Sequence, residues 1–483
     1  MEFRSLAHRG GATGGGRGGG GGTAAPGGWS TRARLLLALA AVSLAAWWLT
    51  PADARLRAKL RFRGQFRKDP TILLVVLDAA RTDRMHLCGA ERPNTPVLDG
   101  LKAAGATVAC DAIAPATWAT PSIASYLTGL DVPDHGVDTV THGPLGGRSL
   151  GKLPSEVETL ADQLIDQGYQ TALISENPTL TNGSGLRQGY THVAVSPKYP
   201  GADGSGVSTS LAALLGGDLD PGRPLFLTLV LSATHEPLAG SPRGVPWLPH
   251  HPSLGCWGRL SPTCKRFLAG SLPADEADAF TRQLVDLYDF AWSRNDAHLG
   301  GALSQLDAWG WRSGPWRLVI VGSSGVLLGE EGRYGTGGSV REAVARVPLL
   351  YASSAGGTEL SEGISARAAW SLAATGAVPA DPLPALSYGG QSGKPARGQP
   401  DLSSPRRAVG YWSGATTQTW ADGVWSAVDL SGDPHEASPR ELDPVSAPEL
   451  SKAVDRWLSV VGWAAPEPDD SPAERGAGAE HRQ

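Results

Sequence analysis

The sequence contains little cysteine and no long run of basic residues, and these two shortages exclude two classes of function. Only four of its 483 residues are cysteine, and no two of them have the C-x-x-C spacing of a zinc–thiolate site. The net charge is −5, and no basic stripe is available to release counterions from a nucleic-acid backbone. We therefore expect neither a cysteine-ligated metal nor a nucleic-acid partner.

The cysteines that are present allow one local pairing. Cys256 and Cys264 stand close together in a loop rich in Pro, His and Gly. A disulfide between them would close this loop if the chain is exported. The alternative is two unpaired thiols, and the sequence leaves both possibilities open.

Glycine is abundant, with 63 residues, and its distribution separates tails from the folded part. Residues 10–22 are a glycine-rich tract with too few apolar groups to fold, so we predict that residues 1–34 form a disordered tail. Residues 464–483 are acidic and rich in proline, and we predict that they are disordered too. Residues 356–405, rich in Gly, Ala, Ser and Pro, are predicted to be partly linker.

One segment has the composition of a membrane anchor or an export signal. Residues 35–49 are almost wholly apolar, follow Arg32 and Arg34, and contain the pair Trp47-Trp48. The run is shorter than the roughly 20 residues that usually span a bilayer. The basic spacer at 50–69 would hold the following chain in the cytoplasm by the positive-inside bias. Anchor and cleaved signal therefore both stay open, and so does the orientation.

The central part of the chain alternates between apolar strands and helices. Residues 71–78 form a β-branched apolar run that ends in Asp78, which is the pattern of a buried parallel strand with a functional group at its carboxyl end. Further strands are predicted at 169–175, 224–231 and 316–321, with helices at 160–168 and around 288–300. This alternation predicts a doubly wound α/β domain with a mostly parallel sheet at 70–355.

Residues 115–129, PATWATPSIASYLTG, are predicted to be a loop followed by a helix. Thr120 is expected to cap the helix, and Pro121 to be its first residue. Unpaired N–H groups and the positive end of the helix dipole make such a start a natural site for a sulfate or phosphate group.

Pro121-Ser122 followed by Leu127-Thr128-Gly129 resembles the signature of the sulfatases of the alkaline phosphatase superfamily. Arg81-Thr-Asp83 and Arg346-Val-Pro348 occur in matching order, and the resemblance covers about residues 70–460. It implies an alkaline-phosphatase-like fold with helices flanking the sheet. It also implies a C-terminal subdomain at 406–463, made of a small antiparallel sheet and a helix.

The resemblance places Ala119 at the position of the family's nucleophile, so the reactive group is lost there. It implies that Asp78 is a retained metal ligand, whereas Ala79, Ser323 and Ser324 stand where other ligands are lost. Ca²⁺ and other divalent cations need several oxygen ligands, which this set supplies poorly. No cofactor is therefore expected, except a divalent cation such as Ca²⁺ if the protein is active.

Three further residues belong to the candidate site by resemblance or by position. Ser122 matches the signature serine, and His235 matches a retained histidine in the context Thr234-His235-Glu236-Pro237. Thr120 is the alternative nucleophile if the alignment to the family signature shifts by one residue, and Thr117 is a similarly less favoured candidate. Neither threonine has an adjacent base in the sequence.

These observations predict a membrane-tethered, sulfatase-like protein whose site is catalytically degenerate. Its pocket would hold a sulfated or phosphorylated ligand, or a protein partner, without turnover. The alternative is an active sulfuric or phosphoric ester hydrolase that uses Thr120 or Thr117, with a metal held by Asp78 and His235. A third possibility is a purely structural envelope protein. By analogy with the family, the chain is expected to be exported to the cell surface or periplasm, with a cytoplasmic orientation left open.

Overall fold

The computed structural model describes residues 67–142, 147–199, 206–217, 219–238, 262–389, 407–433 and 436–461. The predicted tails at 1–34 and 464–483, the apolar segment 35–49, and the spacer up to residue 66 lie outside these ranges. Within the ranges, we find no helix with the length and apolar character needed to cross a membrane.

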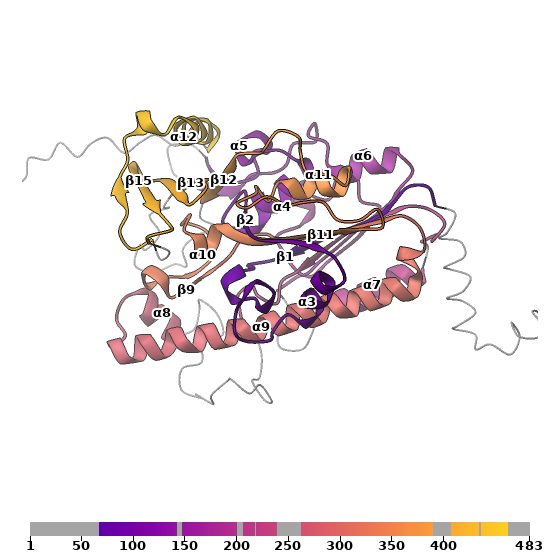
Figure 1. Ribbon diagram of the computed structural model, residues 1–483, viewed down its shortest axis with the longest axis horizontal. Helices are drawn as coiled ribbons and strands as arrows, with labels where there is room; N and C mark the ends of the chain where they lie inside the picture. The colour runs from indigo at the N-terminus through magenta and orange to yellow at the C-terminus, as the bar shows by residue number, and fades with distance from the viewer. Residues whose placement is uncertain are drawn as a thin grey trace, which may run out of the picture. The chain divides into compact units, whose positions relative to one another are not determined.

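The central sheet has seven strands: β1 (Thr71–Leu77), β2 (Thr107–Ile113), β5 (Gln170–Ser175), β6 (His192–Val195), β7 (Leu225–Leu231), β8 (Trp316–Gly322) and β11 (Arg346–Ser353). Their order is β2-β11-β8-β1-β7-β5-β6 (Figure 1). All neighbours are parallel except that β11 runs antiparallel to both β8 and β2. The predicted mostly parallel α/β sheet is confirmed.

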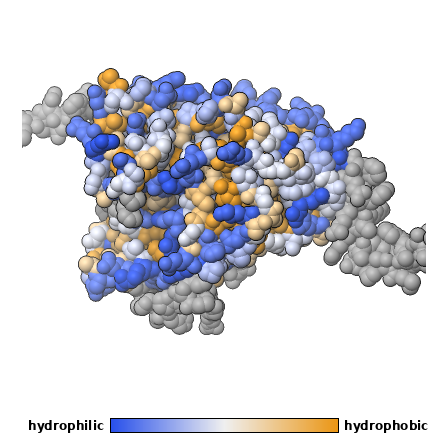
Figure 2. All heavy atoms as spheres, in the orientation of Figure 1, coloured by the Kyte–Doolittle hydropathy of each residue, from blue (hydrophilic) through white to orange (hydrophobic). Residues whose placement is uncertain are grey.

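Helices cover both faces of this sheet (Figure 1). One face carries α3 (Pro96–Ala103), α7 (Gly206–Gly216) and the long α9 (Ala274–Trp309), and the other carries α4 (Ala119–Thr128), α6 (Leu160–Asp166) and α11 (Ala368–Ala374). Strand β1 is buried on both sides: Leu73, Val75 and Leu77 pack toward α9, and the alternate residues pack toward α4. Figure 2 shows hydrophilic side chains along the outer side of α9.

A second, antiparallel sheet completes the fold, with the order β12 (Ala385–Gly389), β13 (Ala408–Ser413), β14 (Thr416–Ala421), β15 (Val424–Asp429) and β16 (Arg440–Glu441). The C-terminal helix α12 (Pro448–Val461) packs on it through Leu450 and Trp457, which meet Val409 and Trp420. The sheet and helix that the family resemblance implied are confirmed. Shorter elements are the hairpins β3 (Thr139–His142) with β4 (Gly147–Leu150) and β9 (Leu327–Leu328) with β10 (Tyr334–Gly335), and the helices α5 (Val132–His135), α8 (Pro262–Leu268) and α10 (Glu342–Ala345).

The predicted linker at 356–405 requires a correction over its first part. This part contains α11 and β12, and Leu372 of α11 is wholly buried in the core. The small, apolar composition that suggested a linker instead allows α11 to pack closely on the sheet. Residues 390–406 lie outside the described ranges.

A disulfide joins Cys88, in the loop before α3, to Cys110 of β2, across 22 residues of sequence. The sequence did not single out this pair, because the partners are distant along the chain. Cys264 is buried in the core on α8. Cys256 lies outside the described residues, so the Cys256–Cys264 pairing stays a prediction.

Candidate functional site

Four neighbouring parallel strands end at one edge of the sheet, and each is followed closely by a polar residue. Asp78 follows β1, Ser232 follows β7, Asn177 follows β5 and Ser323 is near the end of β8. All four are buried. Because the carboxyl ends of adjacent parallel strands meet at one edge, the topology brings these side chains together.

The Asp78 carboxylate accepts hydrogen bonds from three uncharged side chains. The Ser323 hydroxyl donates to Oδ1 at 3.0 Å. The Asn177 amide and the Ser232 hydroxyl donate to Oδ2 at 2.9 and 3.1 Å. Ser323 Oγ also accepts from the Ala79 backbone N–H at 3.3 Å, so this hydroxyl acts as both donor and acceptor. Hydrogen bonds to a charged group are the strong class, so neutral groups hold this buried acid in place.

Ala79, the next residue, has a backbone conformation that alanine rarely adopts. Its φ is 53°, in the left-handed region. Among residues other than glycine, Asn and Asp enter this region most readily because their short polar side chains bond locally. The Tyr288 hydroxyl donates to the Ala79 carbonyl at 2.5 Å and contributes to holding this conformation. The backbone at position 79 therefore suits an aspartate better than the alanine it carries.

A second buried acid, Glu176, lies beside this cluster. Its Oε2 accepts the Ser232 backbone N–H at 2.8 Å, so Ser232 contacts both acids. His298 Nδ1 lies 3.7 Å from Glu176 Oε1. Burial, with a smaller effect from Arg294, lowers the pKa of His298 to about 4, so His298 is neutral at pH 7.

Helix α4 begins two residues earlier than the sequence predicted. Ala119 is its first residue and Trp118 its N-cap, so the prediction of Thr120 as the cap was wrong. The Thr120 hydroxyl instead lies 2.8 Å from the Thr179 hydroxyl, and Thr179 donates to Asn177 Oδ1 at 2.6 Å. Because the Thr179 hydrogen is used toward Asn177, Thr120 is the donor in its own pair. Thr120 is thus linked to Asp78 by hydrogen bonds that pass through Thr179 and Asn177.

The rest of the signature fixes the backbone around α4. The helix ends at Thr128 and Gly129 caps it with φ 74°, as the Leu-Thr-Gly signature requires. The Ser122 hydroxyl donates to the Ala116 carbonyl at 3.0 Å and accepts from the Ala116 N–H at 3.2 Å. Ser122 therefore holds the loop that precedes α4 against the first turn of the helix through these two hydrogen bonds.

Two hydroxyls near the candidate site are buried without partners. Thr117 Oγ1 and Ser324 Oγ have no hydrogen-bond partner in the described part of the chain, and both residues are fully inaccessible. Their backbones are engaged, since Gly337 N–H donates to the Thr117 carbonyl at 2.8 Å and Ala80 N–H donates to the Ser324 carbonyl at 2.5 Å. Most buried hydroxyls are satisfied, so these two positions are exceptional.

His235 reaches the same site through an aromatic neighbour. Its ring stacks on Tyr199, with centroids 3.9 Å apart and planes 8° from parallel. The Tyr199 hydroxyl donates to Asn177 Oδ1 at 3.3 Å. His235 Nδ1 lies 2.7 Å from the Glu236 carbonyl oxygen, and because that oxygen can only accept, Nδ1 is the donor.

Five of the residues that sequence reasoning singled out lie in or beside one hydrogen-bonded cluster. They are Asp78, Ala79, Thr120, His235 and Ser323. The sequence analysis assigned no role to five other residues that belong to the cluster: Asn177, Thr179, Tyr199, Ser232 and Glu176. Glu176 and Ser232 follow a buried strand directly and Asn177 comes one residue later, and that position was the available signal.

The family model described as Sulfatase matches residues 70–358, which is more than half of the chain. The chain belongs to the sulfatase family. No curated protein matches the sequence.

Solved structures agree with the sulfatase fold. BT1596, a 2-O GAG sulfatase, is 14% identical, with a TM-score of 0.56 over 82% of this chain and 93% of that one. The phosphonate monoester hydrolase of Agrobacterium radiobacter is 15% identical, with a TM-score of 0.53 over 82% and 96%. BT4656, solved in complex with its substrate D-glucosamine-2-N,6-O-disulfate, is 16% identical, with a TM-score of 0.52 over 85% and 100%. At these identities the likeness establishes the fold alone.

The divalent cation that the sulfatase family implies does not fit the residues present. Such an ion wants several carboxylate or carbonyl oxygens with free lone pairs. Around Asp78, the Asn177, Ser232 and Ser323 side chains present hydrogens toward the carboxylate, not lone pairs toward an ion. Across the described ranges, no three His, Cys, Asp or Glu side chains are grouped to hold a metal.

Proposed function

We propose that this sulfatase-family protein no longer hydrolyses esters at the family's site, and that it uses the region at the start of α4 to hold a sulfated or phosphorylated ligand or a protein partner. The observation that carries the proposal is the Asp78 carboxylate, engaged by three neutral donors. Ester cleavage needs a cation or fixed donors aimed at the charge that develops on the transferred group. Here the donors are aimed at the protein's own acid.

The nucleophile position supports the same proposal. Ala119 is the first residue of α4 and offers only a methyl group. The neighbouring Thr120 hydroxyl donates to Thr179, and the next atom along the chain of hydrogen bonds is an amide oxygen. An amide oxygen is not a base that accepts a proton at neutral pH, so Thr120 lacks the activation that a hydroxyl nucleophile requires.

The proposal includes a location at a membrane. Residues 35–49 carry it, because they are an isolated apolar run that the basic spacer at 50–69 separates from the domain. Fractionation of the tagged, full-length chain tests this part by itself. We expect it in the membrane or exported fraction, and recovery of the intact chain in the cytosol would contradict the tether.

The catalytic part is tested with the purified full-length protein, aryl sulfates and phosphate diesters. We expect no turnover above background, with or without added Ca²⁺. The loss of one preorganised contact removes roughly 3–4 kcal/mol of transition-state stabilisation, or a hundred- to thousandfold in rate, and here the nucleophile is missing as well. Turnover that Thr120→Ala abolishes would overturn the proposal and favour the alternative, an active hydrolase.

A reversal experiment tests the placement of the site independently of activity. The combined changes Ala119→Thr, Ala79→Asp, Ser323→Asp and Ser324→His should create a divalent-cation site, because they surround Asp78 with lone pairs. Ca²⁺ should then raise the melting temperature of the variant and leave that of the wild type unchanged. A folded variant that Ca²⁺ does not stabilise would show that the site is misplaced.

A further inference from the structure

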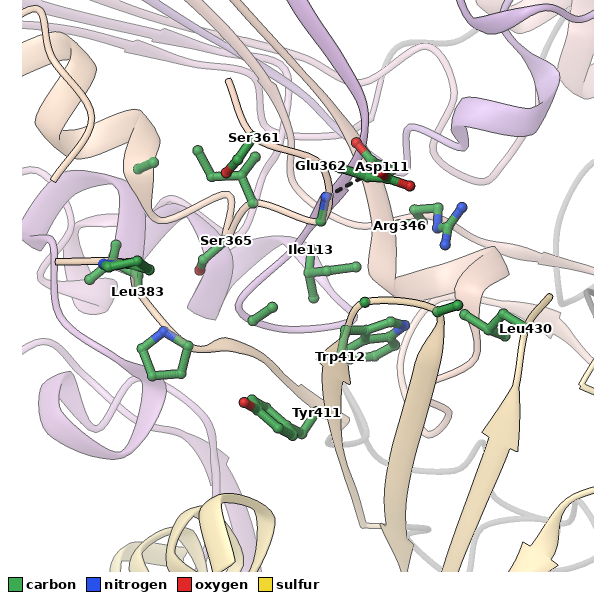
Figure 3. Close-up of a pocket in the computed structure, with 18 of the residues that line it drawn as sticks. Asp111, Ile113, Arg346, Ser361, Glu362, Ser365, Leu383, Tyr411, Trp412 and Leu430 are labelled. Atoms are coloured by element: carbon green, nitrogen blue, oxygen red, sulfur yellow. Dashed lines mark hydrogen bonds between the residues drawn. The ribbon is translucent and has the colours of Figure 1, made fainter. Parts of the chain in front are cut away.

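A cavity of about 1020 Å³ lies where the central domain meets the C-terminal sheet (Figure 3). Its walls come from the end of β2, the start of β11, the segment 361–385 and the end of β13. The family's site is separate from it, because Asp78, Thr120, His235 and Ser323 do not line it. The volume is sufficient for a small organic ligand.

One end of this cavity is acidic. Asp111, Glu342 and Glu362 line it, and Asp111 Oδ2 accepts the Gly363 N–H at 2.7 Å, which places Glu362 next to Asp111. Arg346 is the cation in the lining, and it forms an ion pair with Glu342. Three acids at this end therefore face one arginine. Such an end attracts a cation and repels a sulfate or phosphate group.

Electrostatics within the cavity agree with this excess of acid. Burial raises the pKa of Glu342, and the charges of Asp83 and Asp111 raise it further, although Arg346 acts in the opposite direction. Burial and the neighbouring acids therefore outweigh the effect of Arg346 on Glu342.

The remaining walls are mostly apolar, with a few hydroxyl groups among them. Ile113, Leu383, Tyr411 and Trp412 line them, and Figure 3 shows Leu383 and Tyr411 on the side away from Asp111 and Arg346. Ser365 also lines the cavity, is 2% exposed, and its hydroxyl has no partner among the described residues. A buried hydroxyl without a partner is available to hydrogen-bond a ligand in the cavity.

We propose that this cavity binds a primary ammonium group carried on an apolar stem. The ammonium group lies at the end formed by Asp111 and Glu362, and the stem lies against Tyr411 and Leu383. A free alkylamine and a lysine side chain of a peptide share this chemistry. The proposal concerns a different cavity from the proposed function and does not depend on it.

The test titrates the full-length protein with n-hexylamine by calorimetry. We expect saturable binding, a stronger affinity than for hexan-1-ol, which has the same stem without the charge, and no binding of hexyl sulfate. Affinity should fall when NaCl is raised from 20 to 500 mM, because salt screens partly exposed charges. Nα-acetyl-lysine amide, titrated in parallel, identifies the source: tighter binding than hexylamine favours a peptide lysine, and weaker binding favours a free amine.

Variants locate the binding. Glu362→Gln and Asp111→Asn should each weaken hexylamine binding roughly tenfold, the size expected for one hydrogen bond to a charged group. Asparagine keeps an oxygen for the Gly363 N–H, so the Asp111 variant should fold. Glu156→Gln, which removes an exposed acid that does not line the cavity, should bind as the wild type does. Equal binding of hexanol and hexylamine, unchanged affinity in both cavity variants, or no saturable binding would overturn the proposal.

Discussion

The contacts of Asp78 predict different losses of stability when either of two adjacent serines is replaced, and this pair gives the sharpest test of the site. Ser323 and Ser324 are both fully buried. The Ser323 hydroxyl donates to Asp78 at 3.0 Å and accepts from Ala79 N–H at 3.3 Å, whereas the Ser324 hydroxyl has no partner. The same substitution, serine to alanine, therefore removes two hydrogen bonds in one case and none in the other.

The expected magnitudes follow from these contacts. A hydrogen bond to a charged group contributes about 1.5–3 kcal/mol, and a buried N–H left without an acceptor costs about 1–3 kcal/mol. We expect Ser323→Ala to lower the free energy of unfolding by about 2–4 kcal/mol. Ser324→Ala removes an unsatisfied buried hydroxyl, so we expect a change of less than about 1 kcal/mol, in either direction.

Urea unfolding, followed by circular dichroism with and without EDTA, measures both effects. EDTA should leave the wild-type value unchanged, because neutral groups hold the Asp78 carboxylate. Equal losses in the two serine variants would refute the reasoning about the hydrogen bonds. A wild-type protein that EDTA destabilises by as much as Ser323→Ala does would refute the conclusion that a divalent cation does not fit.

Three other features give predictions. Replacing Cys88 and Cys110 by alanine should lower the free energy of unfolding by about 3 kcal/mol, given the 22-residue separation, and an unchanged urea midpoint would argue against the disulfide. Burial, with a smaller effect from Arg367, lowers the pKa of His135 from 6.5 to about 3. The unfolded chain therefore gains a proton below pH 6.5 that the folded chain does not, and stability should fall by about 1.4 kcal/mol per pH unit from this residue. His135→Gln should flatten the measured slope by that amount, and an unaltered slope would contradict the assignment. Gly325→Ala should fail to give soluble, folded protein, because its Cβ would lie 2.0 Å from a carbonyl oxygen, whereas Gly301→Ala meets nothing within 4 Å and should fold normally.

The fold could be predicted because its signals are local. The apolar run at 71–77 and the similar runs at 225–231 and 316–322 have the composition of strands buried on both faces, and they form adjacent central strands. The signature around α4 fixed the end of the helix through Gly129. It placed the start two residues too late, because the Thr120 hydroxyl does not cap the helix but bonds Thr179, which is distant in sequence.

The partners of Asp78 could not be predicted in the same way. Position after a strand marks Ser232 and Asn177 as candidates, but only the strand order β8-β1-β7-β5 places them around one carboxylate. The disulfide between Cys88 and Cys110 was missed for a related reason, since pairing depends on which loop lies beside β2. Long-range contacts of this kind are set by topology, and a single sequence carries little information on them.

The contacts of Asp78 bear on the proposal that the family's site is catalytically degenerate. A buried carboxylate that loses a neighbouring cation and gains nothing destabilises the fold by several kcal/mol. Ser323 satisfies part of this carboxylate, because one hydroxyl serves both Asp78 and the Ala79 N–H. Ala79, by contrast, has a left-handed backbone that favours aspartate. A satisfied acid beside a backbone that still favours aspartate is what the proposed loss of catalysis predicts.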